Sequence, residues 1–148
     1  MSLVDRVYKQ DGGFDALPRG DQLYYLVNVL SGEVHNGGFD QFFSNSSGER
    51  YLETVAALNE LGASSVEGLL QEAKHVLFGE SDVPAGQMER YHLMATSSTE
   101  RPDYAAVVAR LDQLDKEFYD MANDVGALLS RIAEVHGLYP PSDAQRSH

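Results

Sequence analysis

Apolar residues recur with the period of an α-helix along most of the chain. The first apolar stripe shares one helical face and consists of Leu23, Leu26, Val27, Leu30 and Val34. Pro18 suits the start of this helix, because a proline in the first turn loses no hydrogen bond. Asn36-Gly37-Gly38 predicts its end, since glycine readily adopts the left-handed conformation of a helix cap. A short helical turn with Phe39, Phe42 and Phe43 follows.

The same period predicts further helices downstream. Their stripes run from Tyr51 to Leu61, from Val66 to Leu77, from Met88 to Met94 and from Tyr104 to Ile132. Ser64-Ser65-Val66-Glu67 also predicts a capping box, in which serine and glutamate bond each other's free backbone donors. One helix from Asp103 to His136 would be about 50 Å long, which exceeds the width of a compact domain. We therefore expect a break between Asp112 and Asn123.

No segment alternates strictly between apolar and polar residues, so strand signals are weak. The pattern predicts an all-α fold, a single-domain bundle of about six to eight helices. The length of 148 residues also favours one domain. We expect this domain to cover residues 1–139, with a polar C-terminal tail over 140–148 that begins at Pro140 and Pro141.

Charge and composition narrow the range of partners. The chain has 23 acidic residues against 11 Lys and Arg, a net charge of −12. Such a surface repels phosphate and anionic lipid, so we expect basic partners and no direct binding to nucleic acid or membrane. Cysteine is absent, which excludes disulfides, thiolate metal sites and cysteine nucleophiles. With no apolar leader at the N-terminus, these features predict a cytoplasmic protein.

No established catalytic or metal-binding motif occurs. The five histidines form neither an HExxH motif nor an i, i+4 pair, and there is no P-loop or GxSxG elbow. Carboxylates are too numerous for any pair to stand out as a general acid and base. From these residues we expect no metal, no cofactor and no catalytic residue, and the question of enzyme activity stays open.

The densest polar segment covers residues 35–48, where amides and hydroxyls alternate with three phenylalanines. One interpretation is structural: glycines cap a helix, phenylalanines anchor the connection, and Asn45 or a serine caps the next helix. The other is functional and makes His35, Asn36, Gln41 and Asn45 a polar cluster over an aromatic floor. That cluster could hold a small ligand or a peptide backbone, and the sequence leaves both interpretations open.

This segment resembles the hallmark of a bacterial family of acidic helical domains, whose namesake is DNA-mimic protein nineteen. The matching residues are Glu33, Val34, Asn36, Gly37, Gly38, Phe39, Gln41, Phe42, Phe43, Asn45, Ser46, Ser47 and Gly48. His35 departs from the family, which usually has asparagine there. The segment from Leu111 to Tyr119 is similar to the C-terminal part of the family, and the resemblance covers about residues 20–137.

The resemblance implies a partner. The namesake resembles duplex DNA in charge, and it dimerises to occupy the DNA-binding face of a transcription factor. By resemblance, we expect a basic DNA-binding regulator as partner and a homodimer. A mimic needs carboxylates in an array, and helical residues four apart are spaced by about 6 Å, a scale comparable to strand phosphates. The predicted partner-binding face is acidic and is interrupted by Lys116: Asp112, Asp115, Glu117, Asp120 and Asp124.

Three functions remain open from the sequence. The first is an acidic protein-interaction module, a DNA mimic that occupies the basic face of a partner, and charge and resemblance favour it. The second is a small-ligand-binding domain or an uncharacterised enzyme centred on residues 35–48, with the motif cluster His35, Asn36, Gly37, Gly38, Phe39, Gln41 and Asn45. The third is an adaptor whose acidity only keeps it soluble.

Overall fold

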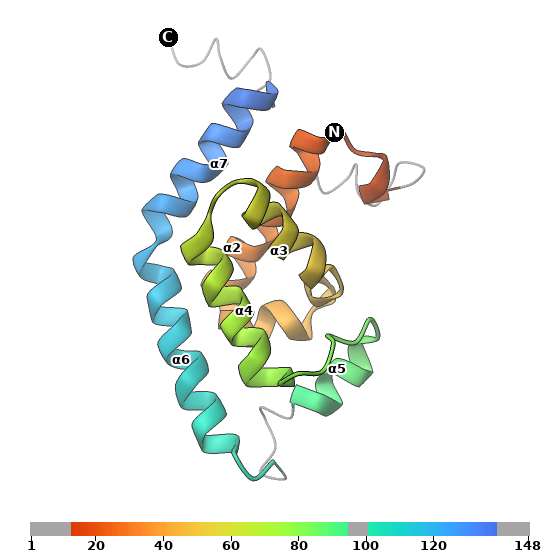
Figure 1. Ribbon diagram of the computed structural model, residues 1–148, viewed down its shortest axis with the longest axis vertical. Helices are drawn as coiled ribbons and strands as arrows, with labels where there is room; N and C mark the ends of the chain where they lie inside the picture. The colour runs from red at the N-terminus through yellow and green to blue at the C-terminus, as the bar shows by residue number, and fades with distance from the viewer. Residues whose placement is uncertain (1–12, 95–100, 139–148) are drawn as a thin grey trace.

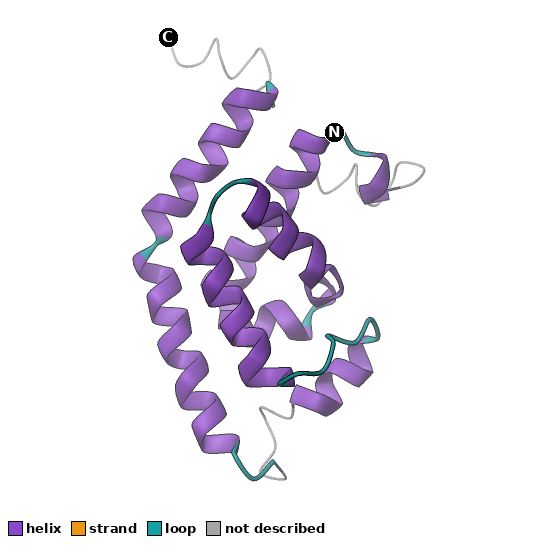
Figure 2. Cartoon of the chain, viewed as in Figure 1, coloured by secondary structure: helices purple, strands orange, loops and turns teal. Residues whose placement is uncertain are grey.

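A computed structural model of the chain describes residues 13–94 and 101–138 (Figure 1). Within these ranges there are six α-helices, two short 3-10 helices and no strand (Figure 2), which confirms the predicted all-α class and the helix number. The predicted tail at 140–148 lies outside the described residues. The elements are η1 (Gly13–Ala16), α2 (Arg19–Ser44), η2 (Ser46–Arg50), α3 (Tyr51–Glu60), α4 (Ser64–Phe78), α5 (Gln87–Met94), α6 (Tyr104–Asp120) and α7 (Ala122–His136).

Helix α2 is the centre of the arrangement. It packs against α3, α5, α6 and α7, while α3 also packs on α4, and α4 packs on α6. Helices α6 and α7 follow each other end to end along one side of the molecule, and we call them the α6–α7 rod (Figure 1). The break between α6 and α7 lies at Met121, which has φ −95° and ψ 9°. This position falls within the predicted interval from Asp112 to Asn123. The Met121 N–H bonds to the Phe118 carbonyl, so α6 closes on a tighter turn.

The apolar stripes supply the core. Helix α6 buries Val107, Leu111, Leu114 and Phe118, and α7 buries Val125, Leu128 and Ile132, as the period predicts. Full burial of one such side chain contributes about 1.5–3 kcal/mol. This side of the core therefore holds the rod against α2 and α4.

In α3 and α5, some of the buried residues differ from those that the apolar pattern predicts. In α3, Leu52 is 77% exposed, whereas Thr54 is buried and donates a hydrogen bond from its hydroxyl to the Arg50 carbonyl at 2.7 Å. In α5, Met88 is 76% exposed, whereas Arg90 is completely buried. A polar group can occupy the core where its donors are bonded, so hydrophobicity alone misses Thr54 and Arg90. The same stripes bury Tyr51, Leu58 and Met94 as predicted.

The predicted capping box at the start of α4 is wrong. Ala63 is the N-cap residue, and no side chain caps this end of the helix. Because Ser64 is already the first helical residue, the serine and glutamate stand out of register for a reciprocal cap. Glu67 instead accepts a hydrogen bond from Asn59 at 3.4 Å.

Helix α2 is interrupted where the sequence predicts its end. Gly37 (φ −152°, ψ 18°) and Gly38 (φ 78°, ψ −178°) leave the helical conformation, and the chain then resumes a short helical stretch from Phe39 to Ser44. Gly38 is buried, and a Cβ atom there would collide with the Asp115 carboxylate. Position 38 therefore requires glycine for two reasons, its positive φ and the close approach of α6.

We predict that Gly38→Ala lowers the free energy of unfolding by about 1–3 kcal/mol, through backbone strain and displacement of Asp115. Gly32→Ala is the matched control, because Gly32 lies in the regular part of α2 with no heavy atom within 4 Å of the added Cβ. That control should gain about 0.5–1 kcal/mol from helix propensity. Urea denaturation measures both, and a Gly38→Ala protein as stable as wild type would contradict the proposed packing at the kink.

Candidate functional site

The kink in α2 is fixed by a carboxylate from the rod. The Phe39 backbone N–H donates to Asp115 Oδ1 at 2.9 Å, across 76 positions of sequence. Phe39 begins the helical stretch after the kink, so its N–H has no partner within that stretch. Asp115 therefore does for this helix end what an N-cap side chain does locally, although it belongs to another helix.

Asp115 is a half-buried member of a carboxylate group. Burial raises the pKa of Asp115, the hydrogen bond from Phe39 lowers it, and the charges of Asp112 and Asp40 raise it again, with a net upward shift. The raised pKa means that the ionised Asp115 costs stability at neutral pH and that this cost disappears as the pH falls through the folded-state pKa. Within the predicted acidic face, Asp115 is the half-buried residue, and it caps the helical stretch that begins at Phe39.

The amides of the motif cluster bond to one glutamate. Gln41 Nε2 donates to Glu33 Oε2 at 2.8 Å, and Asn45 Nδ2 donates to the same oxygen at 2.9 Å. Asn36 Nδ2 donates to Gln41 Oε1 at 3.2 Å. These bonds join residues on both sides of the kink at Gly37 and Gly38. We call the set Glu33, Asn36, Gln41 and Asn45 the amide network.

The phenylalanines of the segment belong to the core. Phe39, Phe42 and Phe43 are each at most 1% exposed. The Phe39 ring meets Phe118 of α6 edge to face, with ring centroids 5.7 Å apart. Phe42 and Phe43 meet edge to face at 5.0 Å. Buried aromatic pairs of this kind stabilise the fold beyond the area that they bury.

His35 packs on the rod and not on the amide network. Its Nδ1 lies 2.8 Å from the Ser31 carbonyl oxygen. Its ring stacks on Tyr119 at 5.5 Å and lies at 5.4 Å from Phe118. Tyr119 in turn donates from its hydroxyl to the Val34 carbonyl at 3.1 Å. Burial, then Asp115 and Asp112, raise the pKa of the Tyr119 hydroxyl, so it keeps its proton as a donor.

Arg90 is a residue that sequence reasoning missed. It is fully buried, and its guanidinium donates to four carbonyl oxygens: Phe43 at 2.8 Å, Asn45 at 3.0 Å, Pro84 at 2.9 Å and Ala85 at 2.7 Å. A cation at a helix C-terminus is favoured by the helix dipole. Arg90 thereby anchors the end of α2 to the loop before α5, and nothing in the local sequence distinguishes it from a surface arginine.

The predicted acidic face divides between two environments. Asp112, Glu117 and Asp120 are exposed on α6, and Asp124 is exposed in the first turn of α7. Asp115 faces the kink instead. Four of the five carboxylates therefore remain accessible along the rod, and their use as a partner-binding face stays a prediction.

The described residues show two further absences. Within 13–94 and 101–138, no group of three or more histidines and carboxylates is placed to hold a metal ion. In the same part of the chain, no helix has both the length and the apolar character needed to cross a bilayer.

We predict that Gln41→Ala lowers the free energy of unfolding by about 1–2 kcal/mol, because it removes a charge-assisted hydrogen bond to Glu33 and the bond from Asn36. Asn28→Ala is the control on the same helix, since Asn28 is exposed, and it should change stability by no more than about 0.5 kcal/mol. Thermal and urea unfolding measure both. If Gln41→Ala is as stable as wild type, these hydrogen bonds of the amide network contribute nothing to stability, and the prediction is wrong.

Comparison with known proteins places the chain in a family. A family model described as DMP19-like protein matches residues 15–136, which include α2, the kink, the amide network and the rod. A search of curated proteins and a search of solved structures each gave no match. Because the model covers most of the chain, the protein belongs to the DMP19-like protein family.

Proposed function

We propose that the protein is an acidic interaction module that covers the basic DNA-binding face of a partner protein, with the α6–α7 rod as its contact surface. The observation that carries this proposal is the distribution of charge: six of the eight described Lys and Arg residues bond to carbonyls or pair with glutamates, while four of the five carboxylates in the predicted acidic face stay exposed on the rod. Family membership supports the same function, since the family takes its name from a DNA mimic.

Six of the eight described Lys and Arg residues fall into two groups, and the other two, Lys116 and Arg131, are exposed on the rod. Three donate hydrogen bonds to backbone carbonyls at helix ends or turns: Lys74, Arg90 and Arg101. Three others form ion pairs with Glu60, Glu53 and Glu72, and these are Arg19, Arg50 and Arg110 respectively. A guanidinium bonded to carbonyls deep in the fold compensates little of the exposed negative charge.

The rod is a suitable contact surface for a basic groove. Helices α6 and α7 together carry six carboxylates and three cations, and Asp112, Asp120 and Asp124 are exposed at intervals of eight and four residues. Asp112 and Asp120 are eight residues apart within α6, which is about 12 Å of helix and spans between three and four strand phosphates at about 3.4 Å per nucleotide. Asp124 follows across the break at Met121. Steering by such charge raises association rates and makes binding sensitive to salt.

Two finer expectations belong to this proposal. A homodimer would present two rods and would match the two-fold symmetry common to DNA-binding regulators. A cytoplasmic location would bring the module to such a regulator. Both rest on resemblance and composition.

We predict that the immobilised protein retains a basic DNA-binding protein from host lysate at low salt and that added duplex DNA releases it. Retention should fall steeply as salt increases, because exposed charges separated by more than about 8–10 Å are screened. If no basic protein is retained, or if duplex DNA leaves it bound, the acidity serves solubility and the proposal fails.

A matched pair of variants distinguishes the rod from net charge. Asp112→Asn, Asp120→Asn and Asp124→Asn combined should weaken binding of the retained protein about tenfold, since exposed ion pairs contribute up to about 1 kcal/mol each. Asp15→Asn, Asp82→Asn and Glu89→Gln combined remove the same charge from exposed positions outside the rod. Equal losses in the two variants would show that total charge matters and the rod does not.

A further inference from the structure

A cleft of about 290 Å³ opens between α2, η2 and α3. Leu26, Val29 and Phe42 give it an apolar side, and Ser46 and Thr54 add hydroxyl groups. None of its lining residues belongs to α6 or α7, so the cleft is distinct from the rod. Its volume is near the lower limit of small-molecule sites, about 300 Å³.

Two carboxylates, Glu33 and Glu49, also line this cleft. Neither forms an ion pair within the described residues. Gln41 and Asn45 both donate to Oε2 of Glu33, which fixes the carboxylate, whereas Oε1 receives no hydrogen bond from the described part of the chain. The amide network therefore holds one acceptor oxygen in a defined position at an apolar cleft, an arrangement that preorganises a binding group.

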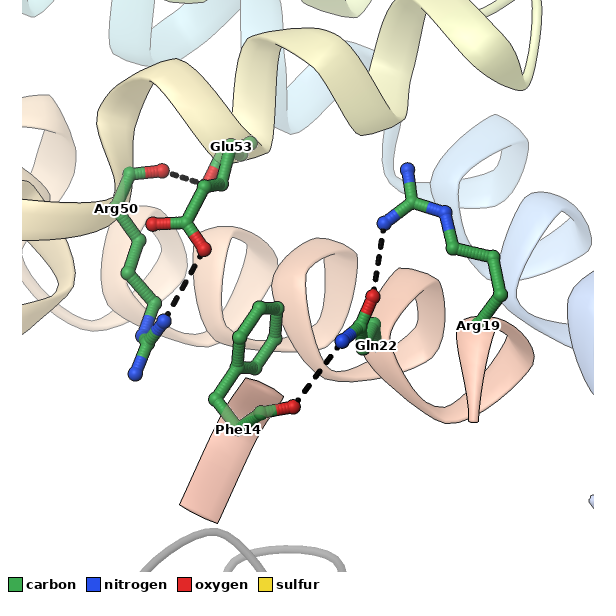
Figure 3. A network of polar contacts seen from close by, with 6 residues as sticks. Phe14, Arg19, Gln22, Arg50 and Glu53 are labelled. Carbon is green, nitrogen blue, oxygen red and sulfur yellow. Dashed lines mark hydrogen bonds and ion pairs between the residues drawn. The ribbon is translucent and has the colours of Figure 1, made fainter. Parts of the chain in front are cut away.

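Arg50 also lines the cleft, but its guanidinium is engaged by other groups. It lies 4.1 Å from the centroid of the Phe14 ring and donates to Glu53 at 3.2 Å, as Figure 3 shows. Figure 3 also shows Gln22 bonded to the Phe14 carbonyl, which ties the Phe14 backbone to α2. Arg50 is therefore held by partners of its own, and Glu33 and Glu49 are left to attract a cation from solution.

We propose that this cleft binds an organic cation: a primary ammonium group on a short apolar chain. The ammonium would bond to Oε1 of Glu33, with Glu49 adding charge at the rim, and the apolar chain would cover Leu26 and Val29. A compact ammonium suits a single available oxygen, whereas a guanidinium prefers two parallel acceptors. The same chemistry occurs in a free amine and in the lysine side chain of a protein. This site goes beyond the proposed function and does not depend on it.

The test is a titration of the full-length protein with n-butylammonium at physiological salt, followed by two-dimensional amide NMR. We expect saturable shifts centred on Glu33, Phe42 and Ser46. n-Butanol has the same apolar chain without the charge, and it should bind at least about tenfold more weakly, because it cannot donate a charged hydrogen bond to Glu33. Shifts of equal size with butanol, or shifts that do not saturate, would overturn the proposal.

Variants locate the site. Glu49→Gln should raise the dissociation constant about threefold, as expected for an exposed charge at the rim of the cleft. Because the Glu49 side chain is exposed, the substitution should leave the fold intact. Glu117→Gln, an equal change of charge on the rod, should leave the affinity unchanged. Equal effects from the two variants would overturn the proposal. N-acetyl-lysine amide distinguishes the source: tighter binding than n-butylammonium assigns the cleft to a protein lysine, and weaker binding assigns it to a free amine.

Discussion

The hydrogen bond from the Phe39 amide to Asp115 joins the kink of α2 to helix α6. Both lie within the residues that the family model matches. Because the Asp115 carboxylate approaches the backbone so closely, position 38 has no room for a side chain, and α2 turns at that point. The turn directs Phe39, Phe42 and Phe43 into the core and brings the end of α2 to the buried Arg90. The same contact, together with the buried apolar residues of α6 and α7, holds the rod against α2.

The hydrophobic period was sufficient for the architecture, because burial of apolar stripes is what selects helices and their packed faces. The glycines predicted a helix end at Asn36-Gly37-Gly38, and the length of the last apolar stripe predicted a break between Asp112 and Asn123, which the structure places at Met121. The hydrophobic period missed the polar residues that are buried with hydrogen-bond partners, Thr54 in α3 and Arg90 in α5. Those partners are carbonyls, and in the case of Arg90 two of them lie more than 40 positions away, so no local pattern could reveal them.

The motif cluster shows the same division between local pattern and long-range contact. The sequence grouped Asn36, Gln41 and Asn45 with His35. In the structure Gln41 and Asn45 both bond to Glu33, and Asn36 bonds to Gln41. The structure also separates His35, which packs on Tyr119 of the rod. Much of the segment is thus explained by the geometry of the kink. What remains exposed, a fixed glutamate oxygen beside a cleft and a row of carboxylates along α6 and α7, is where binding is proposed.

Amide NMR of the protein with the basic protein that it retains tests the central claim most directly, because it identifies which surface makes contact. The account predicts that perturbed amides cluster along α6 and α7, around Asp112, Asp120 and Asp124. Perturbations confined to α3 and α5, with the rod unchanged, would contradict it.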